Sequence, residues 1–246
     1  MKILVLDGSP RKDAGCTMRV TRAFLAGLVR EGEDTAEVIH LSDCRIKPCL
    51  GCLSCWGRTE GTCVIGDDDI PRIKEQILAS DLIISSFPLY FFGMPGTVKV
   101  FCDRMLSMLS TYEGQLPVPG TSFHGIRPGV EGKKFIVISS CGYAQTELVY
   151  DPLLAELDII CGVGAYTPIL CPQGKTLNEP TLTHKIEKFL VKYTDAGREF
   201  RETGALSPET VQYLRKPPFS PRTFQTLLST FWAQERAKGG NRHGDV

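Results

Sequence analysis

The chain has 246 residues, of which 42% are hydrophobic and 23% charged, so it is long enough to bury a sizeable core in one large or two small globular domains. This composition argues against a disordered chain and against a coiled coil. Its 28 Lys and Arg balance 28 Asp and Glu, with no basic block, so we expect neither nucleic acid nor a membrane as a partner. The apolar run before Asp7 is too short for a signal-peptide core, and no later run approaches about 18 apolar residues, which favours a cytoplasmic protein.

Short apolar runs rich in β-branched residues alternate along the chain with segments of helical period. In chain order, strands are expected at 2–6, 36–41, 81–86, 134–139 and 166–170, and helices at about 20–29, 70–78, 98–109, 148–157 and 181–200. Parallel strands need a crossover between them, and helices commonly supply it. The alternation therefore predicts an α/β fold with a five-stranded parallel sheet covered by helices on both faces.

Two regions depart from this alternation. Residues 112–133 are rich in Gly and Pro and are too long for an ordinary connection, so a lid or a partner-contact loop is expected there. Residues 206–246 are expected to form a helical tail after a domain of residues 1–205, with one helix after Pro208 and another over 221–234. The second helix has an apolar face and should therefore pack on another surface, either the main domain or a second subunit. This face consists of Phe224, Leu227, Leu228, Phe231 and Trp232.

The loop after the first expected strand, residues 8–17, is rich in Gly and hydroxyl groups and opens a helix. Such a loop aims backbone N–H groups and the positive helix end at one point, which suits a phosphate. Ser9, Arg11 and Thr17 would supply side-chain donors. The loop matches neither the Walker pattern nor Gly-x-Gly-x-x-Gly, and a plain strand–helix turn capped by Thr17 is the alternative.

Cys16 and Arg22 have the C-x5-R spacing of cysteine phosphatases, in which a thiolate attacks a phosphate. In those enzymes the cysteine ends the strand. Here Cys16 lies ten residues beyond Leu6, and Arg22 is expected inside the helix. The sequence therefore disfavours a phosphatase.

Ten cysteines in a reducing compartment do not indicate a disulfide framework. Four of them, Cys49, Cys52, Cys55 and Cys63, follow one another at gaps of two, two and seven residues. The first three have the compact spacing of ferredoxins, and the longer last gap still lets Cys63 complete the same site. A [4Fe-4S] cluster, a zinc ion, and free or redox-active thiols all remain open for this group.

Several motifs together resemble the flavodoxin-like NADPH-dependent FMN reductases, and within them the iron-sulfur flavoprotein branch. They are the GSPR loop at 8–11, the cysteine run ending in Trp56, the Asp67-Asp68 pair, and the PLYF segment at 88–91 before Phe101-x-Asp-Arg104. The resemblance covers residues 1 to about 200. It implies a five-stranded doubly wound fold, FMN at the carboxyl ends of the strands, and a homodimer or homotetramer.

The resemblance also assigns site residues. By this resemblance the first loop binds the FMN phosphate, and the loops after the third and fourth strands bind the isoalloxazine ring. An insertion at 44–66 holds a [4Fe-4S] cluster. The residues implied for FMN are Ser9, Arg11, Cys16, Thr17, Pro88, Leu89, Tyr90, Phe91, Gly93, Cys141 and Gly142, and those implied for the cluster are Cys49, Cys52, Cys55 and Cys63.

The function expected is an FMN-dependent NAD(P)H oxidoreductase. It would pass electrons from a reduced nicotinamide or another donor through FMN, with or without the cluster, to a small molecule or a ferredoxin-like protein. A non-enzymatic electron carrier is the first alternative and a thiol redox sensor the second. No residue is assigned as a catalytic acid or base.

Overall fold

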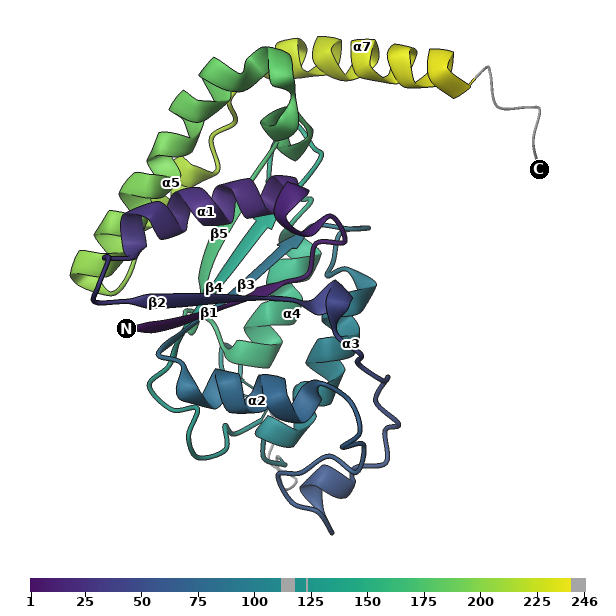
Figure 1. The fold of residues 1–246 in the computed structure, drawn as a ribbon, viewed down its shortest axis with the longest axis vertical. Coiled ribbons are helices and arrows are strands. Elements are labelled where there is room, and N and C mark those ends of the chain that lie inside the picture. The colour runs from purple at the N-terminus through teal and green to yellow at the C-terminus, as the bar shows by residue number, and fades with distance from the viewer. Residues whose placement is uncertain (112–117, 123, 240–246) are drawn as a thin grey trace.

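The computed structural model describes residues 1–111, 118–122 and 124–239. Its centre is one sheet of five parallel strands in the order β2-β1-β3-β4-β5 (Figure 1). The strands are β1 (Lys2–Asp7), β2 (Thr35–His40), β3 (Leu82–Pro88), β4 (Lys134–Ser140) and β5 (Thr167–Cys171). This is the doubly wound order that reverses between β1 and β3, so the expected fold and all five expected strands are confirmed.

Helices cover both faces of the sheet (Figure 1). One face carries α1 (Cys16–Leu28) and α5 (Thr183–Thr203). The other carries α2 (Ile70–Ala79), α3 (Gly96–Arg104) and α4 (Asp151–Cys161). Two hydrophobic clusters, one on each side, therefore hold the sheet between them, and β1, β3 and β4 are buried along most of their length because parallel strands have no solvent face.

Helices α1 and α5 cross at very short range, and glycine makes the crossing possible. A Cβ on Gly27 would lie 1.9 Å from the carbonyl oxygen of Thr194, and one on Gly197 would lie 2.1 Å from that of Phe24. Any larger residue at either position would push the two helices apart. Since α1 starts at the first loop, this crossing also fixes the position of that loop.

One helix is shorter than expected. The segment 98–109 was expected as a single helix, but α3 ends at Arg104 and continues as a 3₁₀ turn, η4 (Met105–Met108). The indole N–H of Trp56 donates to the carbonyl oxygens of both Leu106 and Leu109 at 3.0 Å. These two carbonyl oxygens therefore accept hydrogen bonds from Trp56 of the cysteine loop, and the α-helix does not continue through them.

The C-terminal tail packs on the same chain over its first part. It contains α6 (Pro208–Leu214) and α7 (Pro221–Gly239), and both expected helices are present. Leu214, Phe219 and Phe224 belong to the core beside α5. Further along, α7 extends away from the sheet (Figure 1), and Trp232 is 53% exposed.

The loop expected at 112–133 lies partly outside the described residues, because 112–117 and 123 are not among them. None of the described helices has the length and apolar character needed to cross a membrane.

Candidate functional site

Three loops meet at the carboxyl edge of the sheet, where open α/β sheets bind ligands. They follow β1, β3 and β4, the strands on either side of the point where the strand order reverses. Hydrogen bonds join the loops. Thr17 Oγ1, at the start of α1, lies 2.6 Å from Ser140 Oγ at the end of β4, and the backbone N–H of Leu89 donates to the carbonyl oxygen of Ser140 at 2.9 Å.

The first loop buries its hydroxyl groups while leaving the helix end without a side-chain cap. Ser9 and Thr17 are both almost fully buried. Gly15, not Thr17, is the N-cap of α1, and no side chain caps it, so the alternative of a turn capped by Thr17 is wrong. Helix N-termini with such unsatisfied N–H groups attract anions. The loop therefore has the donors that a phosphate requires.

Arg11 lies in this loop and turns toward the thiol that opens α1. Its guanidinium donates to Cys16 Sγ at 3.1 Å, and its backbone N–H donates to Ser9 Oγ at 3.3 Å. Arg22 lies in the helix and bonds to Asp13 instead, through the carbonyl oxygen at 3.1 Å. Cys16 and Arg22 do not form the thiol–arginine pair of a phosphatase.

The loop after β3 is a strained aromatic turn. Tyr90 and Gly93 exchange two backbone hydrogen bonds at 3.1 and 3.0 Å, and the two residues between them, Phe91 and Phe92, have φ of 47° and 66°. Bulky residues rarely adopt this left-handed conformation, and it concentrates at functional sites. Phe91 is 98% exposed, so burial of its own ring does not explain the strain.

The loop after β4 meets this turn through a ring stack. Phe92 and Tyr143 are stacked with ring centroids 5.6 Å apart and planes 21° from parallel. Cys141 is buried in the core, where burial raises the pKa of its thiol. The thiol therefore behaves as a small core residue.

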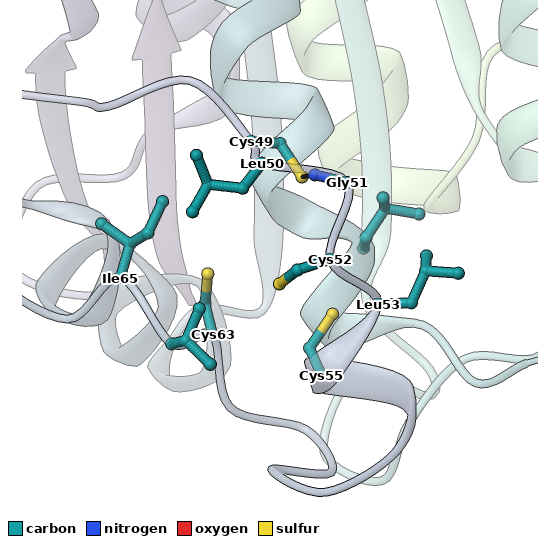
Figure 2. A pocket seen from close by; sticks show the side chains of 10 residues that line it. Cys49, Leu50, Gly51, Cys52, Leu53, Cys55, Cys63 and Ile65 are labelled. Carbon is teal, nitrogen blue, oxygen red and sulfur yellow. Dashed lines mark hydrogen bonds between the residues drawn. The ribbon is translucent and has the colours of Figure 1, made fainter.

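The four ordered cysteines line one small cavity. Figure 2 shows the sulfur atoms of Cys49, Cys52, Cys55 and Cys63 turned toward one another across it. The first three come from a loop in which Gly51 and Leu53 have left-handed backbone angles, with φ of 64° and 53°. Apolar side chains complete the wall; they are Leu50, Leu53, Val64, Ile65 and Leu106.

The thiols in this cavity interact electrostatically. Burial and the neighbouring Cys63, Cys49 and Cys52 raise the pKa of Cys55, whereas hydrogen bonds from Ser54 lower that of Cys52. Throughout residues 1–111, 118–122 and 124–239, no three His, Cys, Asp or Glu are placed to hold a single metal ion. The structure thus brings the four thiols around one space without forming a compact site for one ion.

Positively charged side chains hold the cysteine loop in place. Lys74 Nζ donates to the carbonyl oxygen of Gly61 at 2.9 Å, and Arg127 donates to that of Cys55 at 3.2 Å. The Arg104 guanidinium donates to the carbonyl oxygens of Lys47 and Ile65, both at 2.8 Å. Lys74 and Arg104 also interact electrostatically with Cys63.

The sequence pattern did not single out Arg104 as a partner of this loop. Asp69, the last residue of the Asp67–Asp69 run, is the N-cap of α2. Asp68 has a different role, because it forms a fully buried ion pair with Arg104. The Phe-x-Asp-Arg motif marks Arg104 in the sequence. It does not reveal the partner of Arg104, because Asp68 lies 36 residues earlier in the chain.

Comparison with known proteins agrees with this architecture. Residues 1–158 match the protein family described as having a flavodoxin-like fold. An iron-sulfur flavoprotein of Archaeoglobus fulgidus is 36% identical over 165 residues, which cover 66% of this chain and 77% of the relative. An FMN-dependent NADH:quinone oxidoreductase of Cupriavidus necator is 27% identical over 58% of this chain and 68% of its own. This chain spans about half the length of several other curated relatives that it matches.

Among solved structures, an FMN-dependent NADH-azoreductase of Bacillus anthracis in complex with FMN superposes with a TM-score of 0.57. The match covers 82% of this chain and all of the azoreductase, at 17% sequence identity. At that identity the likeness concerns the fold.

Proposed function

Because this chain belongs to the family with the flavodoxin-like fold, we propose that it is an FMN-dependent NAD(P)H oxidoreductase. The observation that carries the proposal is the junction of three loops at the carboxyl edge of the sheet. It is made by the Thr17–Ser140 hydrogen bond and the Phe92–Tyr143 stack. One side of this junction offers anion donors and the other offers exposed aromatic rings, which are the two surfaces that a flavin mononucleotide needs.

The first loop would hold the FMN phosphate. Ser9 and Thr17 supply buried hydroxyl groups, the uncapped end of α1 supplies N–H groups, and Arg11 supplies a positive charge. Arg11 already lies within the loop through its contact with Cys16. Rotation of the guanidinium from this thiol to the phosphate would exchange a weak sulfur acceptor for a charged one.

The aromatic turn and the loop after β4 would hold the isoalloxazine ring, through Pro88, Leu89, Tyr90, Phe91, Gly93 and the backbone of Cys141 and Gly142. FMN supplies the redox chemistry when bound, by accepting a hydride from NAD(P)H and passing the electrons onward. The protein orients the ring and excludes water from it. The left-handed backbone at Phe91 and Phe92 supports this proposal, because such strain concentrates at functional sites.

We infer that Cys49, Cys52, Cys55 and Cys63 hold a [4Fe-4S] cluster. Four thiolates are the donors that such clusters use, and the apolar wall and the nearby Lys74 and Arg104 suit an anionic group. Zinc fits less well. A tetrahedral site with zinc–sulfur bonds of about 2.3 Å needs sulfur atoms about 4 Å apart, and the described thiols are not placed to hold one ion.

The electron donor in this proposal is NADH or NADPH, and the acceptor is a quinone-like small molecule or a ferredoxin-like protein. The relative from Cupriavidus necator, by its name, uses NADH and a quinone. We further propose that the protein acts as a homodimer or homotetramer in the cytoplasm.

Anaerobic purification tests the proposal directly. The expected product has flavin absorption bands, a broad iron-sulfur shoulder, about four iron and four sulfide ions per chain, and NAD(P)H oxidation when a quinone is added. Protein without flavin would overturn the whole proposal, and flavin without iron would overturn the cluster. Flavin and cluster without NAD(P)H oxidation would favour the electron carrier over the enzyme.

Two cysteine variants separate the cluster from general thiol chemistry. Cys63→Ser should lose the iron-sulfur shoulder while keeping flavin. Cys44→Ser is the matched control, because Cys44 is close in sequence but does not line the cavity. Equal iron content in both variants would contradict the ligand assignment.

A further inference from the structure

A buried carboxylate lies directly beneath the first loop. Asp7 is the last residue of β1, and its side chain is completely buried. One oxygen, Oδ1, accepts a hydrogen bond from the backbone N–H of Ser9 at 3.0 Å. The other, Oδ2, lies 2.7 Å from Nδ1 of His40. The last residue of β2 is His40, and it pairs in register with Asp7 across the sheet, so the contact follows from the strand pairing itself.

The imidazole of His40 lies between two carboxylates. Its Nε2 atom is 3.8 Å from Asp13 Oδ2, on the side opposite Asp7. The other charged groups in this region already have partners: Asp13 pairs with Arg22, and Lys12 pairs with Asp43. An imidazolium would donate to Asp7 and be attracted by the charge of Asp13, whereas the neutral ring donates from one nitrogen only and carries no charge.

The charge of Asp7 conflicts with the proposed role of the loop above it. A phosphate bound by Ser9 would lie close to a buried carboxylate, and two negative groups repel strongly where little water intervenes. The pKa of Asp7 lies above its usual value, because the effect of burial outweighs the opposing effects of the Ser9 N–H and His40. The carboxylate is thus costly in this position unless a positive charge accompanies it.

We propose that His40 is a positioning residue for the FMN phosphate. In this proposal the imidazolium form of His40, held 2.7 Å from Asp7, offsets the charge of the buried carboxylate, and Asp7 in turn fixes the Ser9 N–H at the base of the loop. Affinity for a phosphate-bearing flavin therefore depends on the charge balance between Asp7 and His40, and affinity for riboflavin does not. This inference rests on the proposed FMN site.

The test is titration of the apoprotein with FMN and, separately, with riboflavin, followed by quenching of flavin fluorescence. The measured quantity is the ratio of the two dissociation constants. In His40→Gln, which keeps a hydrogen-bonding side chain without charge, the preference for FMN should fall about tenfold, the effect of one unpaired charge several ångströms away. His184→Gln is the control, because His184 is exposed on α5, and it should keep the wild-type ratio.

A double variant distinguishes charge balance from simple structural damage. Asp7→Asn combined with His40→Gln removes both charges and keeps similar shapes, so the FMN preference should return toward the wild-type value. A mere loss of packing would leave the double variant as weak as His40→Gln or weaker. Far-ultraviolet circular dichroism establishes that each variant is folded before titration.

The outcomes separate this inference from the proposed function. If the wild-type apoprotein binds neither flavin, the FMN function itself is wrong. If the wild type prefers FMN and His40→Gln keeps the full preference, the role of His40 is wrong. The role of His40 is also wrong if the double variant does not recover the preference for FMN.

Discussion

Arg104 and Asp68 form an ion pair in which both side chains are completely buried. The same guanidinium binds the carbonyl oxygens of Lys47 and Ile65, which precede Cys49 and follow Cys63. One side chain of α3 therefore closes the cysteine loop at both ends. It does so from the helix that follows the aromatic turn, so the aromatic turn and the cysteine loop share one support.

Arg104→Gln should destabilise the protein by about 3–5 kcal/mol, because it leaves the buried Asp68 carboxylate without its partner. Iron content per flavin should fall as well, since the loop is released at both ends. Urea denaturation and iron analysis measure the two effects. Lys99→Gln, in the exposed Lys99–Asp103 pair of the same helix, should change stability by less than about 1 kcal/mol. Wild-type stability in Arg104→Gln would contradict this role.

Acid should weaken the same contact. Burial opposes ionisation of Asp68, but Arg104 and the backbone N–H of Lys47 prevail and hold the pKa of Asp68 below its usual value. The stability from this ionised carboxylate is therefore present above about pH 4 and is lost as the pH falls through the lower folded-state pKa. Asp68→Asn should make the unfolding free energy less dependent on pH in acid. An unchanged pH dependence would contradict the role assigned to the ionised Asp68.

Thr17→Val should weaken FMN retention, because it removes a buried hydroxyl from the first loop, the proposed phosphate site, and leaves Ser140 without this partner. A loss of about 1–3 kcal/mol in binding is expected for a removed hydrogen bond to a charged group. Thr21→Val is the matched control one helical turn later, where the hydroxyl bonds to Ser86 instead. Dialysis and flavin fluorescence compare the two, and equal retention would count against the assignment.

Phe91→Gly should be more stable than Phe91→Ala by about 1 kcal/mol, because glycine accepts a φ of 47° without strain. Both variants lose the exposed ring, so both should bind FMN less tightly than the wild type. Thermal unfolding and flavin titration measure these effects separately. Equal stability of the two variants would show that the turn is not strained.

Lys192 offers a test at alkaline pH. Burial lowers the pKa of its ammonium group to about 8, and in the unfolded chain a lysine titrates near 10.4. Between these values the unfolded state binds more protons, so this residue makes the unfolding free energy rise with pH. Urea denaturation from pH 7 to 10 should show a smaller rise in Lys192→Met than in Lys188→Met, an exposed control on the same helix. An identical pH dependence would contradict this assignment.

Lys192→Met should also loosen the C-terminal tail. The ammonium donates to the carbonyl oxygens of Tyr213, Leu214 and Lys216 at 3.4, 2.9 and 2.7 Å. Without it, these carbonyls at the end of α6 lose their shared donor. Limited proteolysis should therefore cut the tail faster in Lys192→Met than in Lys188→Met.

The sequence by itself determined the sheet and the candidate loops. Alternation of β-branched runs with helical period indicates buried parallel strands, because burial on both faces of a strand demands apolar residues in succession. The same local logic located Ser9 and Thr17 at a strand–helix junction and the four cysteines within one short segment. These are properties of neighbours along the chain, and their spacing is visible in one dimension.

Only the tertiary structure decided which distant groups meet. Pairing of β1 with β2 sets Asp7 beside His40, and packing of α3 sets Arg104 beside Asp68. Neither partner is implied by local spacing, since strand register and helix packing depend on the whole core. The left-handed backbone at Phe91 and Phe92 was equally hidden, because local preference opposes it. The balance of charge around the proposed FMN and cluster sites is thus a consequence of the folded chain.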